Sequence, residues 1–125
     1  MSENKEIIEK VNTSFEQKQL ETFLDLCTDD VIWQMAGMED QKGKDSIRKF
    51  MASMGEGDPP KINVTAIISD GDRAACYGDM TMKEKGEENA YDYCDIYKFT
   101  DGKIAELRSF FAKHQAEGEA EKAAA

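Results

Sequence analysis

The apolar residues of this 125-residue chain change their spacing near Pro60, and this change constrains the fold more than any other feature. Before Pro60 they recur every three or four positions, which is the period of a helix with one buried stripe. After Pro60 they alternate with other residues, which is the period of a strand with one buried face. Helices first and strands after them favour an α+β domain, with the helices packed on one face of an antiparallel sheet.

Three helices and one strand are expected before Pro60. The helical spacing predicts a first helix over about residues 2–17, a second over about 20–27 and a third over about 45–54. The second helix should end at Thr28-Asp29-Asp30, where polar side chains can bond to their own backbone and form a turn. Segment 31–35 is β-branched and aromatic, and it predicts a strand.

Turn signals divide the second half of the chain into four strands. They fall at Asp70-Gly71-Asp72, Lys85-Gly86-Glu87 and Asp101-Gly102, and hairpin turns commonly carry such residues. Four strands joined in this way predict an antiparallel meander. We therefore expect one domain over residues 1–115, followed by a mobile tail over 116–125 that has too little apolar surface to pack.

The charge of the chain excludes several partners. With 26 acidic and 16 basic residues, the net charge of −10 would repel nucleic acid and anionic membrane surfaces. No apolar stretch approaches the roughly 20 residues of a membrane helix, and no export signal is present at the start. The expected location is the cytoplasm, with no nucleic-acid or membrane partner.

Cofactor and metal motifs are absent from the sequence. Three cysteines without a C-x-x-C pair indicate neither a disulfide framework nor a zinc site. Phosphate-binding glycine loops, H-E-x-x-H and G-x-S-x-G do not occur. No metal and no cofactor are expected.

One carboxyl group interrupts an aromatic row in the third strand of the meander. Alternation places Asp95 on the same face as Tyr93 and Tyr97. A carboxyl group among aromatic side chains loses hydration, so its pKa rises toward neutrality, as an acid or base at neutral pH requires. The alternatives are that this row faces a partly wet surface, or that tyrosine hydroxyls satisfy an ionised Asp95.

The sequence resembles a known family at several points of this pattern. The strings Cys94-Asp95-Ile96-Tyr97-Lys98-Phe99 and Asp101-Gly102-Lys103-Ile104 look like those of the SnoaL-like and ketosteroid isomerase-like group. This group belongs to the nuclear-transport-factor-like (cystatin-like α+β) superfamily. The resemblance covers about residues 7–113 and implies three helices closing a strongly curved antiparallel sheet into a cone-shaped apolar pocket. It also implies a homodimer that forms through the outer face of the sheet.

The resemblance further implies which side chains line the pocket. Besides Asp95, they are Val11, Phe15, Trp33, Met35, Phe50, Met54, Gly78, Met80, Met82, Tyr93, Tyr97, Leu107, Ser109 and Phe111.

Catalytic residues carry over from the resemblance at only one position. Ketosteroid isomerases use a tyrosine, an aspartate base and a third-strand aspartic acid that an apolar site keeps protonated. Asp95 matches the last of these, whereas Val11 and Met35 stand at the other two positions. Epoxide hydrolases of this fold need an arginine flanked by two aspartates, and Tyr93 stands where one of them belongs. SnoaL-like cyclases, which use one aspartate as acid and base, fit Asp95 better.

Two functions remain open from the sequence. The first is a protein that binds a small apolar or aromatic molecule in its internal pocket and uses Asp95 as acid and base in an isomerisation or cyclisation. The second is a non-catalytic ligand-binding or dimerisation module of the same fold, which the missing isomerase residues favour.

Overall fold

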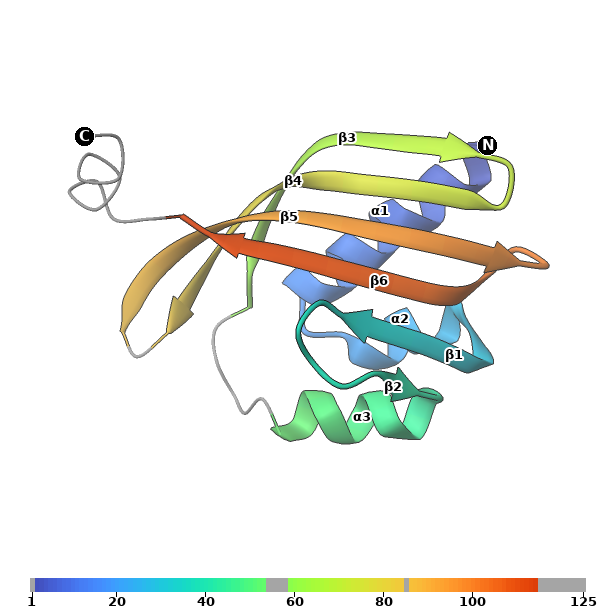
Figure 1. Ribbon diagram of the computed structural model, residues 1–125, viewed down its shortest axis with the longest axis horizontal. Coiled ribbons are helices and arrows are strands. Elements are labelled where there is room, and N and C mark those ends of the chain that lie inside the picture. The colour runs from blue at the N-terminus through green and yellow to red at the C-terminus, as the bar shows by residue number, and fades with distance from the viewer. Residues whose placement is uncertain (1, 54–58, 85, 115–125) are drawn as a thin grey trace.

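The computed structural model describes residues 2–53, 59–84 and 86–114. Over these residues the chain forms three helices and six strands. Figure 1 shows how they are arranged in space. In chain order they are α1 (Ser2–Glu16), α2 (Leu20–Asp25), β1 (Cys27–Met35), β2 (Gln41–Lys42), α3 (Lys44–Ser53), β3 (Lys61–Asp70), β4 (Arg73–Glu84), β5 (Glu87–Thr100) and β6 (Lys103–Lys113). The α+β class and the three expected helices are confirmed, whereas the predicted tail lies outside the described residues.

The six strands form one curved sheet in the order β2-β1-β6-β5-β4-β3. Strands β3 to β6 pair antiparallel with their neighbours in sequence, so the predicted meander is confirmed. Its turns contain Gly71 and Gly102, whose φ angles of 62° and 78° are unfavourable for residues with a Cβ. Strand β1 pairs parallel with β6, so one pair in the sheet is parallel.

The region between α2 and α3 differs from the sequence prediction. The expected turn at residues 28–30 is part of β1, which already begins at Cys27. The register with β6 shifts between Cys27 and Ile32, and Asp29 and Asp30 are exposed at this irregularity. Turn-forming side chains are tolerated there because they point into water and the ladder is interrupted. The short strand β2 was not predicted, because two residues are too few to show alternation.

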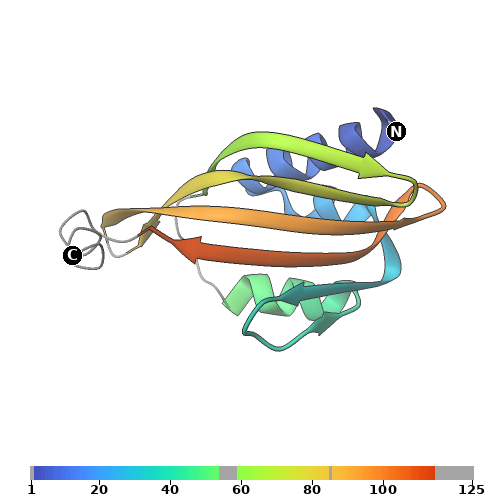
Figure 2. The same ribbon diagram turned by 45° about the horizontal axis from the view of Figure 1, so that its top comes forward.

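All three helices cover the same face of the sheet, which we call the inner face. Helix α1 packs along β3 and β4, and α2 and α3 pack near β1 (Figures 1 and 2). Where α1 ends, the Glu16 carboxylate accepts a hydrogen bond of 2.9 Å from the backbone N–H of Ile62. The inner face and the helices enclose the core, whose buried members include Ile8, Val11, Phe23, Leu24, Val31, Trp33, Ile47, Tyr97, Ile104 and Leu107.

A bulge in β3 adds to the bend of the sheet. It lies between Val64 and Ala66, opposite Gly78 of β4. A side-chain carbon on Gly78 would overlap the backbone carbonyl of Asn63, so the close approach of the two strands requires glycine. Bulges increase the local twist and bend the strand that contains them.

The described part of the chain contains no helix that is both long and apolar enough to cross a membrane. Cys27, Cys76 and Cys94 are free thiols, and the first two are buried. Packed thiols of this kind behave as small apolar side chains.

Candidate functional site

Asp95 lies on the inner face of β5, between two buried tyrosines. Tyr93 and Tyr97 are 5% and 0% exposed. In the ladder Asp95 stands opposite Cys76 of β4 on one side and Ser109 of β6 on the other. The carboxyl group is therefore surrounded by side chains of three neighbouring strands.

A first hydrogen-bonded group connects Asp95 to β1. The Trp33 indole Nε1–H donates to the Ser109 Oγ at 3.0 Å, and both residues are buried. Ser109 in turn forms a hydrogen bond with the Asp95 carboxyl group. Phe15, Phe23 and Phe50 surround the Trp33 ring, with centroid distances of 5.7, 5.6 and 6.4 Å.

A second polar group lies on the other side of Asp95. The Asn12 side-chain amide of α1 donates to the Cys76 Sγ at 3.7 Å, and the Tyr93 hydroxyl lies 3.6 Å from the same sulfur. Both are long, weak contacts to sulfur. The Cys76 thiol therefore contacts both Asn12 and Tyr93.

Burial changes the acidity of the whole cluster. It raises the pKa of Asp95 from 3.8 to about 7, and the hydrogen bond from Ser109 opposes this rise. It also raises the pKa values of Cys76, Tyr93 and Tyr97 above their usual values, so these groups stay neutral near pH 7. The buried polar residues of the described chain are Asn12, Ser14 and Ser109, and none of them carries a compensating charge. Asp95 is thus the group of this cluster that can gain or lose a proton near neutral pH.

Two polar atoms of the cluster have no hydrogen-bond partner in the described part of the chain. They are Oδ1 of Asp95 and the hydroxyl oxygen of Tyr97, and both are buried. The Asp95 residue as a whole is only partly buried, whereas its Oδ1 atom has no contact with solvent. A buried polar atom without a partner costs about 1–3 kcal/mol, so a site of this kind is suited to a ligand that supplies the missing bonds.

The structure brings most of the sequence-predicted pocket residues together on the inner face. Val11, Trp33, Met80 and Leu107 are buried there, and the partly buried members pack against this core; they are Phe15, Met35 and Met82, with Phe50 packed on the Trp33 ring. Phe111 is left out, because it is 47% exposed near the end of β6. Met54 lies outside the described residues.

Sequence reasoning missed Asn12 and Cys76. Asn12 follows Ile8 by four residues and precedes Phe15 by three, so the helical period already placed its side chain on the buried stripe. No local signal could have identified Cys76, because its place opposite Asp95 depends on the register of β4 and β5.

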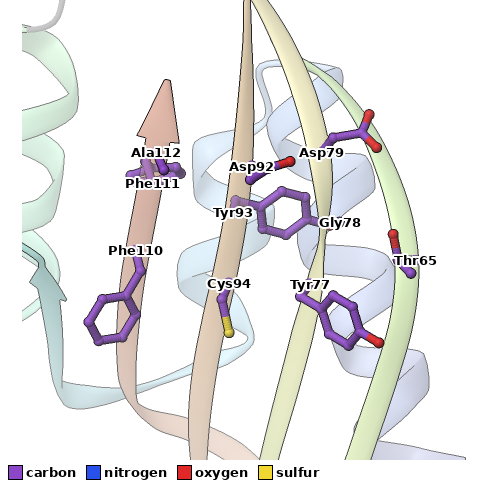
Figure 3. A pocket seen from close by; sticks show the side chains of 10 residues that line it. All are labelled: Thr65, Tyr77, Gly78, Asp79, Asp92, Tyr93, Cys94, Phe110, Phe111 and Ala112. Atoms are coloured by element: carbon purple, nitrogen blue, oxygen red, sulfur yellow. The ribbon is translucent and has the colours of Figure 1, made fainter. Parts of the chain in front are cut away.

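The other face of the sheet, which we call the outer face, carries an open hollow of about 650 Å³. Tyr77, Cys94 and Phe110 stand side by side on β4, β5 and β6, as Figure 3 shows, and we call these three residues the outer row. Asp79 and Asp92 lie next to this row toward one end of the strands. Arg108 lies on the opposite side of the row, with its guanidinium 5.7 Å from the centre of the Phe110 ring.

Metal binding has no candidate in the part of the chain that the structure describes. Three or more His, Cys, Asp or Glu side chains that could hold one ion do not come together there.

Several solved structures resemble the fold of this chain. An NTF2-like protein of unknown function from Burkholderia pseudomallei matches with a TM-score of 0.80 and 16% identity over 98% of this chain and 97% of that chain. An LEH-like epoxide hydrolase of M. tuberculosis matches with a TM-score of 0.78 and 15% identity over 89% and 84% of the two chains. A protein assigned as a SnoaL-like polyketide cyclase of Jannaschia sp. gives 0.77 and 15% over 88% and 85%. Identities this low establish the NTF2-like fold alone.

The sequence itself identifies the family. The family model of the SnoaL-like domain matches residues 8–107. The chain therefore belongs to the SnoaL-like family, as the resemblance implied. A comparison with curated protein sequences gave no match.

Proposed function

We propose that the protein binds a small apolar or aromatic molecule on the inner face of its sheet, and that Asp95 exchanges a proton with it in an isomerisation or cyclisation. The observation that carries this proposal is the Asp95 carboxyl group, which has a pKa raised to about 7 and a buried oxygen without a partner. A group with a pKa near the working pH is present in both protonation states and can act as acid and base in turn.

The surroundings of Asp95 favour chemistry that needs one such group. Val11 and Met35 stand where a ketosteroid isomerase has its tyrosine and its base, and neither side chain can transfer a proton. The Tyr97 hydroxyl can donate a hydrogen bond to a ligand oxygen, because it has no partner among the residues that the structure describes. Removal of a proton next to a carbonyl group, followed by its return at another atom, needs no further residue.

Exchange of the α-protons of 2-tetralone in D2O tests this proposal, with tetralin as the matched hydrocarbon. Trp33 is the one tryptophan of the chain, so its fluorescence reports binding. The protein should accelerate the exchange by about 100-fold over buffer, and Asp95→Asn should abolish the acceleration. Asp70→Asn, a change at an exposed aspartate of β3, is the control and should keep it.

Three other outcomes are informative. If neither compound changes the fluorescence of Trp33, the binding proposal fails. If both bind and no exchange is catalysed, the protein is a non-catalytic carrier. If exchange persists in Asp95→Asn, another group is the base.

We also propose that a second copy of the chain covers the outer face. The observation in favour is the exposed apolar surface there: Ile68, Tyr77, Ile96 and Phe110 are 59%, 40%, 37% and 38% exposed. Clusters of exposed apolar residues around a hollow are typical of protein interfaces. A two-fold axis along the outer row would bring Arg108 of one copy toward Asp79 and Asp92 of the other copy. The opposite charges would then complement each other.

Sedimentation velocity tests this dimer. The wild type should sediment as a dimer, and Arg108→Glu should weaken the association. Adding Asp92→Arg to that variant should restore it, because the same pair of charges is then reversed. A monomeric wild type at about 100 μM, well above the dissociation constants of stable dimers, would contradict the proposal.

The thiols bear on where the protein works. All three cysteines are free, and Cys94 lies in the outer row. We propose the cytoplasm, where thiols stay reduced. Cell fractionation should find the protein there, and recovery from an oxidising compartment would contradict this.

A further inference from the structure

We propose that Trp33 and Ser109 are positioning residues, which form a one-way hydrogen-bond chain ending on Asp95 and aim its free oxygen at the ligand. This inference rests on the proposed function, because it concerns how the same carboxyl group is prepared for proton exchange. The three residues come from β1, β6 and β5, so the chain crosses three neighbouring strands.

The direction of the chain follows from the chemistry of its members. The Trp33 Nε1–H can only donate, so at 3.0 Å the Ser109 oxygen must accept. The one hydroxyl hydrogen of Ser109 is then left to donate to Asp95, which accepts as an ionised carboxylate. Ser109 is 2% exposed, so water does not compete for this hydrogen.

The fold holds both donors in place. Met35 of β1 pairs with Ser109 of β6, and Ser109 pairs with Asp95 of β5, so the ladder fixes the serine between them. Packing of the Trp33 ring among three phenylalanines fixes the direction of its N–H.

The chain also decides which oxygen of Asp95 is available. Because Oδ1 has no partner, the hydrogen bond from Ser109 falls on the other oxygen. One oxygen is thus anchored and the other is free for a ligand. Such anchoring keeps a catalytic group in its productive orientation without blocking its reactive lone pair.

The bond from Ser109 stabilises the charged form of Asp95, whereas burial destabilises it. The titratable groups around the carboxyl are Cys76 of β4, and Tyr93, Cys94 and Tyr97 of its own strand. Their pKa values are all raised, so they remain neutral while Asp95 titrates. The titration of Asp95 therefore reports on the chain from Trp33.

Carboxyl ¹³C NMR of the ligand-free protein measures this titration directly. Ser109→Ala should raise the pKa of Asp95 by about one unit, a tenfold change in its acidity, because the charged form loses a donor. Trp33→Phe keeps an aromatic ring, and it should raise the pKa by a smaller amount. Ser14→Ala is the matched control: Ser14 is as buried as Ser109, but its hydroxyl donates to the Val11 carbonyl, so this change should have no effect.

The double variant separates a chain from two independent contacts. Trp33→Phe should add nothing in the Ser109→Ala background, because tryptophan acts through the serine. Ser109→Thr keeps a hydroxyl group at this position, so the pKa of Asp95 should stay at its wild-type value. An unchanged pKa in Ser109→Ala, or additive shifts in the double variant, would overturn the inference. If Ser109→Ala does not fold, an unchanged pKa in Trp33→Phe overturns it as well.

Failure here is distinguishable from failure of the proposed function. The pKa is measured without any ligand, whereas the function is tested by binding and proton exchange of 2-tetralone. If the pKa shifts occur as expected but the protein binds neither test compound, the hydrogen-bond chain exists and its role in ligand binding is contradicted.

Discussion

Asp92 and Asp95 lie three residues apart on β5, yet they face opposite sides of the sheet. Asp92 is exposed on the outer face, where its carboxylate meets His114 at 2.9 Å. On the inner face no charged group of the described residues contributes to the acidity of Asp95, and burial raises its pKa to about 7. The same type of side chain is thus an ordinary surface group at position 92 and a candidate acid and base at position 95. The difference comes from the environment that the helices create over one face only.

The largest expected contrast between the two faces is in packing. Tyr97→Ala removes a fully buried ring from the inner face and should lower the free energy of unfolding by about 3–5 kcal/mol. Tyr77→Ala removes a 40% exposed ring from the outer face and should cost less than about 1 kcal/mol. Urea unfolding at a protein concentration that keeps the chain monomeric measures both. Equal losses would show that the inner face is not the core side of the sheet.

The second contrast is in pH dependence. Because the pKa of Asp95 is higher in the folded chain than in the unfolded chain, its contribution to stability is fully present below about pH 4 and is lost as the pH rises to about 7. The free energy of unfolding of the wild type relative to Asp95→Asn should therefore fall over this range, by about 4 kcal/mol in total.

Denaturation in urea at several pH values measures this second effect. Asp92→Asn is the control from the outer face. Its free energy of unfolding should still fall as the pH rises, whereas Asp95→Asn should lose this part of the pH dependence. If the difference between wild type and Asp95→Asn does not vary with pH, the carboxyl group is not buried as the structure has it.

The smallest expected effect concerns a charge on the outer face. Arg108→Ala removes an exposed contact with the Phe110 ring and should change the stability of the monomer by at most about 0.5 kcal/mol. Arg73→Ala, at another exposed arginine, serves as the control. A loss of several kcal/mol in monomeric protein would show that Arg108 belongs to the fold rather than to an association surface.

Local periodicity was sufficient to predict much of this molecule. Alternation along residues 91–99 correctly placed Asp95 on one face with Tyr93 and Tyr97, and the turn residues located the hairpins. Both predictions depend on neighbours within a few positions, where the period of the backbone alone decides which way a side chain points. The pocket itself, the homodimer and the catalytic role of Asp95 stay predictions.

Local patterns along the chain are enough to predict the class of the protein, the order of its helices and strands, and the face on which Asp95 lies. The groups that surround that carboxyl depend on how the distant parts of the chain pack together. Trp33 and Ser109 are 76 positions apart, and Asn12 and Cys76 are 64 apart, so their contacts depend on how β1 joins β6 and how α1 lies on the sheet. Such contacts follow from packing and strand register, because no local pattern encodes the partner of a residue that is distant in the chain.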